Sequence, residues 1–241
     1  MKKILFIGNS LTRGECGVDY TSAITGRFPQ HRFINEGQNG DTLLGITGRL
    51  IAILKKRKFD VVVIEAGIND ILLPHVRKRS LIKRLYAYKA KKRGSLVTPV
   101  EIFGRVLDKR LTRILGLTNA RILITTLSCV GEDLSSDLNL KRKTVNEQIR
   151  RVARKHRLTV ANIGLEFDSL LKQRRESRYL IGSSLNVIID MLRSAAPSWI
   201  DSISRQRALH LTSDGVHLNS RGAKVYSDVL CRHLGPDQQV A

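Results

Sequence analysis

Cysteine is scarce in this chain of 241 residues, which has only Cys16, Cys129 and Cys231. So small and odd a number favours neither a disulfide framework nor a cysteine-based zinc site, and it fits a reducing compartment. No window approaches the ~20 consecutive apolar residues that a membrane-spanning helix needs. The apolar stretch behind Lys2 and Lys3 ends at Gly8 and is too short for the apolar region of a signal peptide. We therefore expect a soluble, cytoplasmic protein.

Acidic residues are also few: 21 Asp and Glu stand against 42 Lys and Arg, a formal net charge of +21. This excess exceeds what solubility requires, and a polyanionic partner such as nucleic acid, an anionic membrane surface or an acidic carrier is one explanation. A generally basic surface without any partner explains it equally well.

Two segments, which we expect to be largely helical, hold much of the positive charge. The first is residues 77–93, in a stretch without any acidic residue. The second cluster consists of Lys141, Arg142, Lys143, Arg150, Arg151, Arg154, Lys155 and Arg157. Aromatic residues make up only 5% of the chain, and Tyr86 and Tyr88 are the main ones between the basic residues. Recognition of single-stranded nucleic acid by stacking is therefore poorly supported.

Five short apolar runs predict the strands of the fold: residues 4–7, 33–34, 61–64, 122–127 and 159–163. Runs that are apolar on every residue indicate strands covered on both faces, which is typical of a parallel sheet flanked by helices. Amphipathic spacing predicts helices within residues 42–58, within 145–152 and after residue 219. We expect an α/β fold, with residues 1–241 as one domain long enough to bury a large core.

Two helical segments are longer than a crossover between parallel strands needs. Residues 75–117 form a basic, mostly helical excursion with a break near Gly94 and Pro99. Residues 177–205 carry apolar side chains at amphipathic spacing: Leu185, Ile188, Leu192 and Trp199. Either segment could cover a binding crevice as a lid. The alternative, which we favour for the second segment, is that its apolar stripe packs on the sheet.

Ser10 follows the first apolar run, in Gly8-Asn9-Ser10-Leu11. A serine at the carboxyl edge of a parallel sheet is held by a rigid strand and faces the crevice where ligands of such sheets bind. This is a suitable position for a nucleophile. The alternative is a turn serine that caps the next helix.

Polar groups follow the second and third runs as well. Gly40 lies in residues 35–42, before a predicted helix, where a backbone N–H can face a developing anion. The segment matches no phosphate-binding glycine motif. Asn69 lies in Gly67-Ile68-Asn69-Asp70, and its amide could donate a hydrogen bond into the same crevice. Asn69 could instead form a simple Asx turn at the end of a strand.

Near the C-terminal end, Asp214 and His217 share the segment Asp214-Gly215-Val216-His217. A carboxylate three positions before an imidazole can hold one ring nitrogen while the other faces a serine. The pair therefore provides the base and the orienting acid that Ser10 would require.

The order of these four segments resembles the SGNH hydrolase family, also called the GDSL lipase/esterase family. Its four sequence blocks match the segments that contain Ser10, Gly40, Asn69 and His217. The resemblance implies a flavodoxin-like three-layer α/β/α sandwich with a five-stranded parallel sheet. It also implies that the reaction needs no metal and no cofactor.

The resemblance assigns a role to each residue. Ser10 would be the nucleophile, His217 the general base and Asp214 the acid that orients it. The N–H groups of Ser10 and Gly40 and the side-chain amide of Asn69 would form the oxyanion hole. One residue departs from the pattern, because Asn9 stands where the family has Asp.

The function expected from these residues is that of a serine esterase or acylhydrolase. It would cleave an ester or thioester of a small molecule or lipid through an acyl-serine intermediate. Two alternatives remain: an acyltransferase on the same fold, and a non-catalytic basic protein that binds nucleic acid or an anionic surface. The sequence leaves the oligomeric state open.

Overall fold

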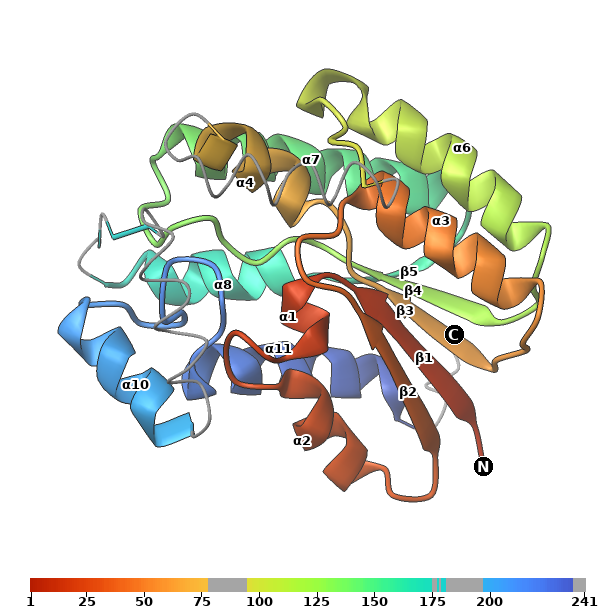
Figure 1. Cartoon of the computed structure of the whole chain (residues 1–241), viewed down its shortest axis with the longest axis horizontal. Helices are drawn as coiled ribbons and strands as arrows, with labels where there is room; N and C mark the ends of the chain where they lie inside the picture. The colour runs from red at the N-terminus through yellow and green to blue at the C-terminus, as the bar shows by residue number, and fades with distance from the viewer. Residues whose placement is uncertain (78–94, 175–176, 178, 181–196, 236–241) are drawn as a thin grey trace.

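In the computed structural model, which describes residues 1–77, 95–174, 177, 179–180 and 197–235, the chain forms one five-stranded parallel sheet (Figure 1). The strand order is β2-β1-β3-β4-β5. The strands are β1 (Lys3–Gly8), β2 (Arg32–Gly37), β3 (Val61–Ile64), β4 (Arg121–Thr125) and β5 (Thr159–Ala161). The parallel α/β class and the five strands match the expectation from sequence.

Helices cover both faces of this sheet and complete three layers (Figure 1). One face carries α3 (Leu43–Leu54), α4 (Ile68–Arg77), α6 (Phe103–Leu115) with the short η1 (Val100–Ile102), and α7 (Asp137–Lys155). The other carries α2 (Tyr20–Arg27), α8 (Ile163–Leu171), α10 (Pro197–Gln206) and α11 (Ser220–Leu234). The short α1 (Ser10–Arg13) follows β1 directly. No helix in the described ranges is long and apolar enough to cross a membrane.

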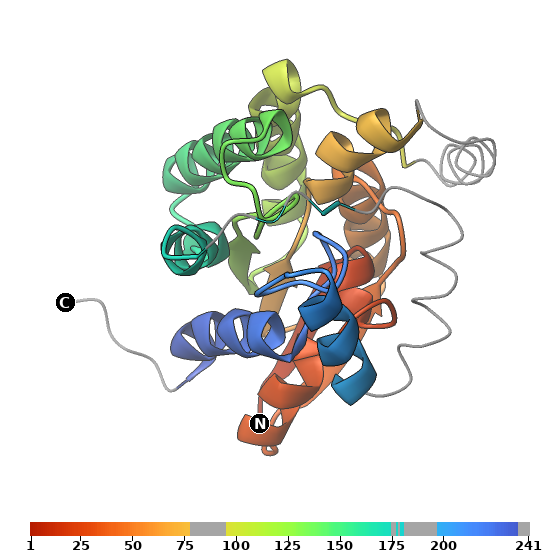
Figure 2. The ribbon, with the colours of Figure 1, turned by 90° about the vertical axis from the view of Figure 1, so that its left-hand side faces the viewer.

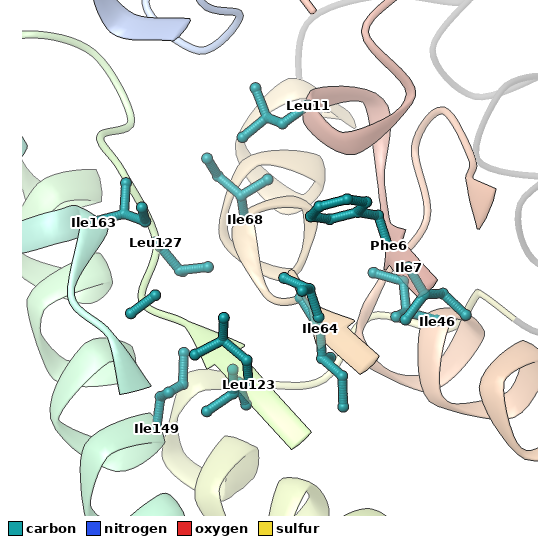
Figure 3. Packing of buried hydrophobic residues seen from close by; sticks show 14 of the residues in the cluster. Phe6, Ile7, Leu11, Ile46, Ile64, Ile68, Leu123, Leu127, Ile149 and Ile163 are labelled. Carbon is teal, nitrogen blue, oxygen red and sulfur yellow. The ribbon is translucent and has the colours of Figure 1, made fainter. Parts of the chain in front are cut away.

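The core lies on both sides of the central strands. Ile4, Leu5, Phe6 and Ile7 of β1 are all buried, as are the four residues of β3. They belong to one cluster with apolar side chains from helices on both faces, such as Ile46 of α3 on one face and Ile163 of α8 on the other (Figure 3). β2 is an edge strand, and its residues are only partly covered. This core holds the ends of β1 and β3 in place beneath the candidate site.

Two predicted strands are shorter than expected. β4 ends at Thr125 rather than at residue 127. Beyond it the Asn146 side chain bonds the Leu127 backbone, accepting from its N–H at 2.7 Å and donating to its carbonyl at 3.0 Å. β5 ends at Ala161, since Asn162 is already the N-cap of α8. An apolar run cannot distinguish the end of a strand from the buried start of a helix.

One member of the predicted basic cluster is not on the surface. Arg142 is completely buried, and its guanidinium donates to Asp168 at 2.6 Å and to Asn139 at 2.8 Å. Arg142 therefore does not share an exposed face with the rest of the cluster, because helical spacing places it on the inner face of α7, where Asp168 supplies a countercharge. Lys141 and Lys155 are exposed and pair with Asp137 and Asp108.

The two long excursions are described only in part. Residues 78–94 and 181–196 lie outside the described residues, so the predicted lid and the stripe from Leu185 to Leu192 lie there too. In the described remainder, α6 follows the predicted break at Pro99. Trp199 on α10 is 60% exposed and does not pack on the sheet, in contrast to the packing that we favoured.

Candidate active site

The turn from β1 into α1 places Ser10 at the carboxyl edge of the sheet. Asn9 is the N-cap of α1, and its side-chain oxygen accepts from the Leu11 N–H at 2.9 Å. A Cβ on Gly8 would come within 2.1 Å of the Thr12 hydroxyl oxygen, so only glycine fits this close turn. Ser10 follows the N-cap as the first residue of α1, and it is 9% exposed.

Ser10, His217 and Asp214 are brought together from opposite ends of the chain. The Ser10 Oγ lies 3.0 Å from His217 Nε2, and His217 Nδ1 lies 2.6 Å from Asp214 Oδ2. Figure 2 looks onto the carboxyl ends of the strands and shows the blue loop before α11 close to the red α1. The three side chains lie in the order that a nucleophile, a base and an orienting acid would require.

Asp214 is held so that it can orient the imidazole. Its Oδ1 accepts the backbone N–H groups of Val216 and His217 at 2.9 and 2.7 Å, which leaves Oδ2 for His217 Nδ1. Burial alone would raise the pKa of Asp214, but the adjacent His217 and these hydrogen bonds hold the pKa below its usual value. An ionised Asp214 accepts a hydrogen bond from the N–H at Nδ1, so the proton stays on Nδ1 and the lone pair on Nε2 faces Ser10.

Three candidate oxyanion donors surround the same edge. Gly40 has a φ of +73°, a left-handed conformation that glycine adopts without strain. Among the described residues, neither the Ser10 N–H nor the Gly40 N–H has a hydrogen-bond acceptor. Asn69 lies in the first turn of α4 and donates one amide hydrogen to the Asp41 carbonyl at 2.9 Å. Since a primary amide carries two such hydrogens, the second remains for a ligand.

Arg49 ties these segments together, and the sequence analysis missed it. Its guanidinium donates to the Glu36 and Gly8 carbonyls at 2.7 and 3.0 Å, and its Nε donates to the Asp41 carboxylate at 2.8 Å. It thus links the end of β1, just before Ser10, to the segment around Gly40. An arginine on an amphipathic helix carries no signal of such partners in sequence, because the partners are mostly backbone carbonyls of distant segments.

Asp70 was quoted as part of a motif but was given no role. Its carboxylate accepts the Leu43 N–H at 2.9 Å and the Thr98 N–H at 2.7 Å. Burial raises the pKa of Asp70 to about 7, although these hydrogen bonds oppose the shift. Asp70 therefore joins the start of α4, which carries Asn69, to the start of α3 and the segment before α6.

Glu65, also missed, explains why asparagine stands at position 9. The carboxylate of Glu65 accepts the Asn9 backbone N–H at 3.2 Å and the Asn9 side-chain N–H at 2.8 Å, and it also accepts the Thr12 hydroxyl. An aspartate at position 9 would bring a second carboxylate against Glu65, whereas Asn9 supplies a donor. Burial raises the pKa of Glu65 to about 7 in spite of these bonds.

Replacing Glu65 by glutamine is expected to change how stability depends on pH. The folded-state pKa of about 7 lies above the ordinary 4.5, so the contribution of Glu65 is present below pH 4.5 and lost as pH rises through 7. Glutamine does not titrate, so the variant does not lose stability as the pH rises through this range. The difference in unfolding free energy, variant minus wild type, should therefore increase with pH by up to about 3 kcal/mol. Urea unfolding from about pH 4 to about pH 8 measures the difference.

Glu147→Gln is the control for this prediction, because it removes one negative charge from an exposed position on α7. Its unfolding free energy should follow that of the wild type across the same pH range. Parallel curves for wild type and Glu65→Gln would contradict the prediction.

Within the described ranges, no group of three or more His, Cys, Asp or Glu side chains could hold a metal ion. The residues brought together are those of acyl transfer: a hydroxyl with a base at 3.0 Å, and N–H donors beside it.

Comparisons with known proteins agree with this fold. The model of the GDSL-like lipase/acylhydrolase family matches residues 6–225. Among solved structures, Axe2, an acetylxylan esterase from Geobacillus stearothermophilus, shares 16% identity and a TM-score of 0.62, covering 98% of this chain and 95% of that one. The acetyl xylan esterase AlAXEase shares 18% identity and a TM-score of 0.61, covering 96% of this chain and 99% of that one.

A third similar structure is LAE5, an alpha/beta hydrolase enzyme from the metagenome of Lake Arreo in Spain. It shares 19% identity and a TM-score of 0.61, covering 97% of this chain and 95% of that one. A comparison with the curated proteins found no match.

The fold and the family match define an enzyme of the serine hydrolase class with the SGNH-type architecture. The chain belongs to the GDSL-like lipase/acylhydrolase family.

Proposed function

We propose that this enzyme hydrolyses a carboxylic ester or thioester through an acyl-serine intermediate, with Ser10 as nucleophile. The observation that carries the proposal is the 3.0 Å contact between Ser10 Oγ and His217 Nε2, with Asp214 on the other ring nitrogen. This is the geometry of an activated nucleophile with a base that is itself oriented.

The reaction has two halves. In the first, Ser10 Oγ attacks the acyl carbonyl while His217 Nε2 takes the hydroxyl proton, and the proton then passes to the leaving alcohol or thiol. In the second, His217 takes a proton from water as the water oxygen attacks the acyl carbonyl, and it passes this proton to Ser10 Oγ when the bond between Oγ and the acyl group breaks and the acid leaves. The oxyanion of each tetrahedral intermediate would be stabilised by the N–H groups of Ser10 and Gly40 and by the Asn69 amide.

A substrate panel tests this proposal. p-Nitrophenyl esters of increasing acyl length, one thioester and an acetylated xylooligosaccharide are incubated with the wild-type chain. The last compound enters the panel because Axe2 and AlAXEase are described as acetylxylan esterases. We expect hydrolysis of at least one short ester, with a fluorophosphonate adduct at Ser10. The absence of both turnover and adduct would refute the proposal.

Adding alcohols to the same assay separates hydrolysis from acyl transfer. A hydrolase yields the free acid as the main product, whereas a transferase yields the new ester. No described residue favours an acceptor other than water, so we expect the acid.

Replacing Asn69 by alanine is expected to lower kcat for the preferred ester by about 10²- to 10³-fold, as for other oxyanion donors. The amide also donates to the Asp41 carbonyl, so the substitution could lower stability. The thermal unfolding of the variant should therefore be measured together with its kinetics. Asn35→Ala is a matched control, because Asn35 lies on β2, where its amide donates to the Thr12 carbonyl. A kcat for Asn69→Ala within about threefold of wild type would exclude Asn69 from the oxyanion hole.

Part of the positive charge of the described residues lies away from the candidate catalytic residues. Three lysines follow the C-terminal end of α3: Lys55, Lys56 and Lys58. Two arginines lie at the C-terminal end of α7: Arg154 and Arg157. Since these helices run antiparallel to the strands, their C-terminal ends lie at the edge opposite Ser10. Any polyanion bound there would leave the catalytic edge open.

A further inference from the structure

Another buried carboxylate, that of Glu132, lies in the connection between β4 and α7. It is 2% exposed, and it accepts four hydrogen bonds from a distant loop. Oε1 accepts the N–H groups of Leu211 and Thr212 at 2.8 Å each and the Thr212 hydroxyl at 2.7 Å. Oε2 accepts the His210 N–H at 2.6 Å.

The loop that Glu132 holds is the one that carries Asp214 and His217. Glu132 holds it at residues 210–212, before Asp214. The neighbouring Gly131 N–H donates to the Gly215 carbonyl at 2.7 Å, after Asp214. The β4–α7 connection thus holds the loop on both sides of the catalytic acid. The Thr212 hydroxyl also accepts the Gly215 N–H at 3.2 Å and links the two points of attachment.

A carboxylate is the side chain that suits this position. Four donors converge on two oxygen atoms, and each donor needs an acceptor that brings no N–H of its own. Glutamine has nearly the same shape, but its amide nitrogen would face at least one of these donors. Glu132→Gln therefore removes the anchor with little change in volume.

The anchor is itself fixed to the body of the protein. The Asn139 amide on α7 donates to the carbonyls of Val130 and Gly131 at 3.1 and 3.0 Å. The buried Arg142 donates to Asn139 Oδ1 at 2.8 Å. These bonds hold Glu132 against α7, so the catalytic loop is attached to a long, packed helix rather than to another loop.

We propose that Glu132 is a positioning residue, whose carboxylate keeps His217 Nε2 at hydrogen-bond distance from Ser10 Oγ. This inference rests on the proposed function for its catalytic consequence. A displacement of the imidazole by about 1 Å is enough to cost about 10²-fold in rate. Such a displacement affects proton transfer more than binding of a small ester.

The test compares Glu132→Gln with wild type on the preferred ester. We expect kcat to fall by about 10- to 100-fold, the rate of labelling by a fluorophosphonate to fall in parallel, and KM to change by less than about threefold. Asp133→Asn is the matched control, since the adjacent Asp133 carboxylate accepts from Ser135. It should keep kcat within about twofold of wild type. A folded Glu132→Gln with wild-type kcat and labelling rate would overturn the proposal.

A milder variant decides the question if Glu132→Gln does not fold. Thr212→Val removes the hydroxyl that donates to Glu132 while it keeps the branched shape of the side chain. We expect kcat to fall by about 3- to 10-fold with KM unchanged. Wild-type kcat in the folded Thr212→Val would then overturn the proposal.

NMR separates failure of this inference from failure of the proposed function. The proton that His217 shares with Asp214 should give a strongly downfield signal, because the two atoms lie 2.6 Å apart. We expect this signal to shift or broaden in Glu132→Gln and to stay in place in Asp133→Asn. A wild-type chain without esterase activity would refute the proposed function, and the signal would still report on positioning. An unchanged signal in Glu132→Gln would refute positioning by Glu132.

Discussion

Ser10→Ala is expected to lower kcat for the preferred ester by about 10⁴-fold or more, because no acyl-serine can form without the hydroxyl. The residual rate would come from the oxyanion donors and from binding. The substitution removes a single oxygen atom from a side chain that is 9% exposed and adds no bulk to the buried site, so the variant should fold. Initial rates with the p-nitrophenyl ester measure the loss, and the intact mass after fluorophosphonate treatment shows whether an adduct still forms.

Ser22→Ala is the control for this experiment. Ser22 lies on α2, and its hydroxyl donates to Asp19 rather than to an imidazole. We expect wild-type turnover and a normal adduct from Ser22→Ala, and neither from Ser10→Ala. Full activity in Ser10→Ala would show that another group attacks the ester.

Asp214→Asn is expected to lower kcat by about 10³- to 10⁴-fold, although the side chain keeps its shape. The two backbone N–H groups that now bind Oδ1 would hold the amide oxygen in the same place. The amide nitrogen would then face His217 Nδ1 and donate to it. The imidazole would carry its proton on Nε2, toward Ser10, and could not accept the serine proton.

The pH profile distinguishes this cause from a general loss of structure. Without the Asp214 charge, the imidazolium form of His217 loses its partner, so the pKa seen in kcat/KM should fall. Asp137→Asn, at an exposed position on α7, should leave both kcat and the profile unchanged. An unaltered profile with near-wild-type kcat in Asp214→Asn would mean that His217 acts without an orienting acid.

Sequence patterns predicted most of the framework of this fold. The apolar runs located all five strands, because a central parallel strand is buried on both faces and leaves an uninterrupted apolar segment. The edge strand β2 is only partly covered, and its apolar run, residues 33–34, marks only part of Arg32–Gly37. The predicted carboxyl ends of β4 and β5 each lie two residues too far along the chain, because each strand is followed within two positions by a buried apolar residue. Arg142 was counted with the residues of a basic cluster, since composition does not show that it is buried against a countercharge on α8.

The residues of the candidate site likewise fall into two groups, those that the sequence indicated and those that only the structure showed. Ser10, Gly40, Asn69 and His217 each stand in a short segment that can be read locally, at the end of a strand or before a helix. Arg49, Glu65 and Glu132 cannot be read in this manner. Their partners are largely backbone groups of segments far away in the chain, and backbone groups leave no pattern in a sequence.

By itself, then, the sequence determined the α/β class, the strand segments and the chemical groups available for catalysis. Only the tertiary structure decided that Ser10 and His217, separated by 207 positions, lie 3.0 Å apart. It also decided that Glu132 is hydrogen-bonded to the loop that carries His217. The physical reason is that apolar periodicity depends on neighbouring residues, whereas a hydrogen bond between distant segments depends on how the whole sheet and its helices pack.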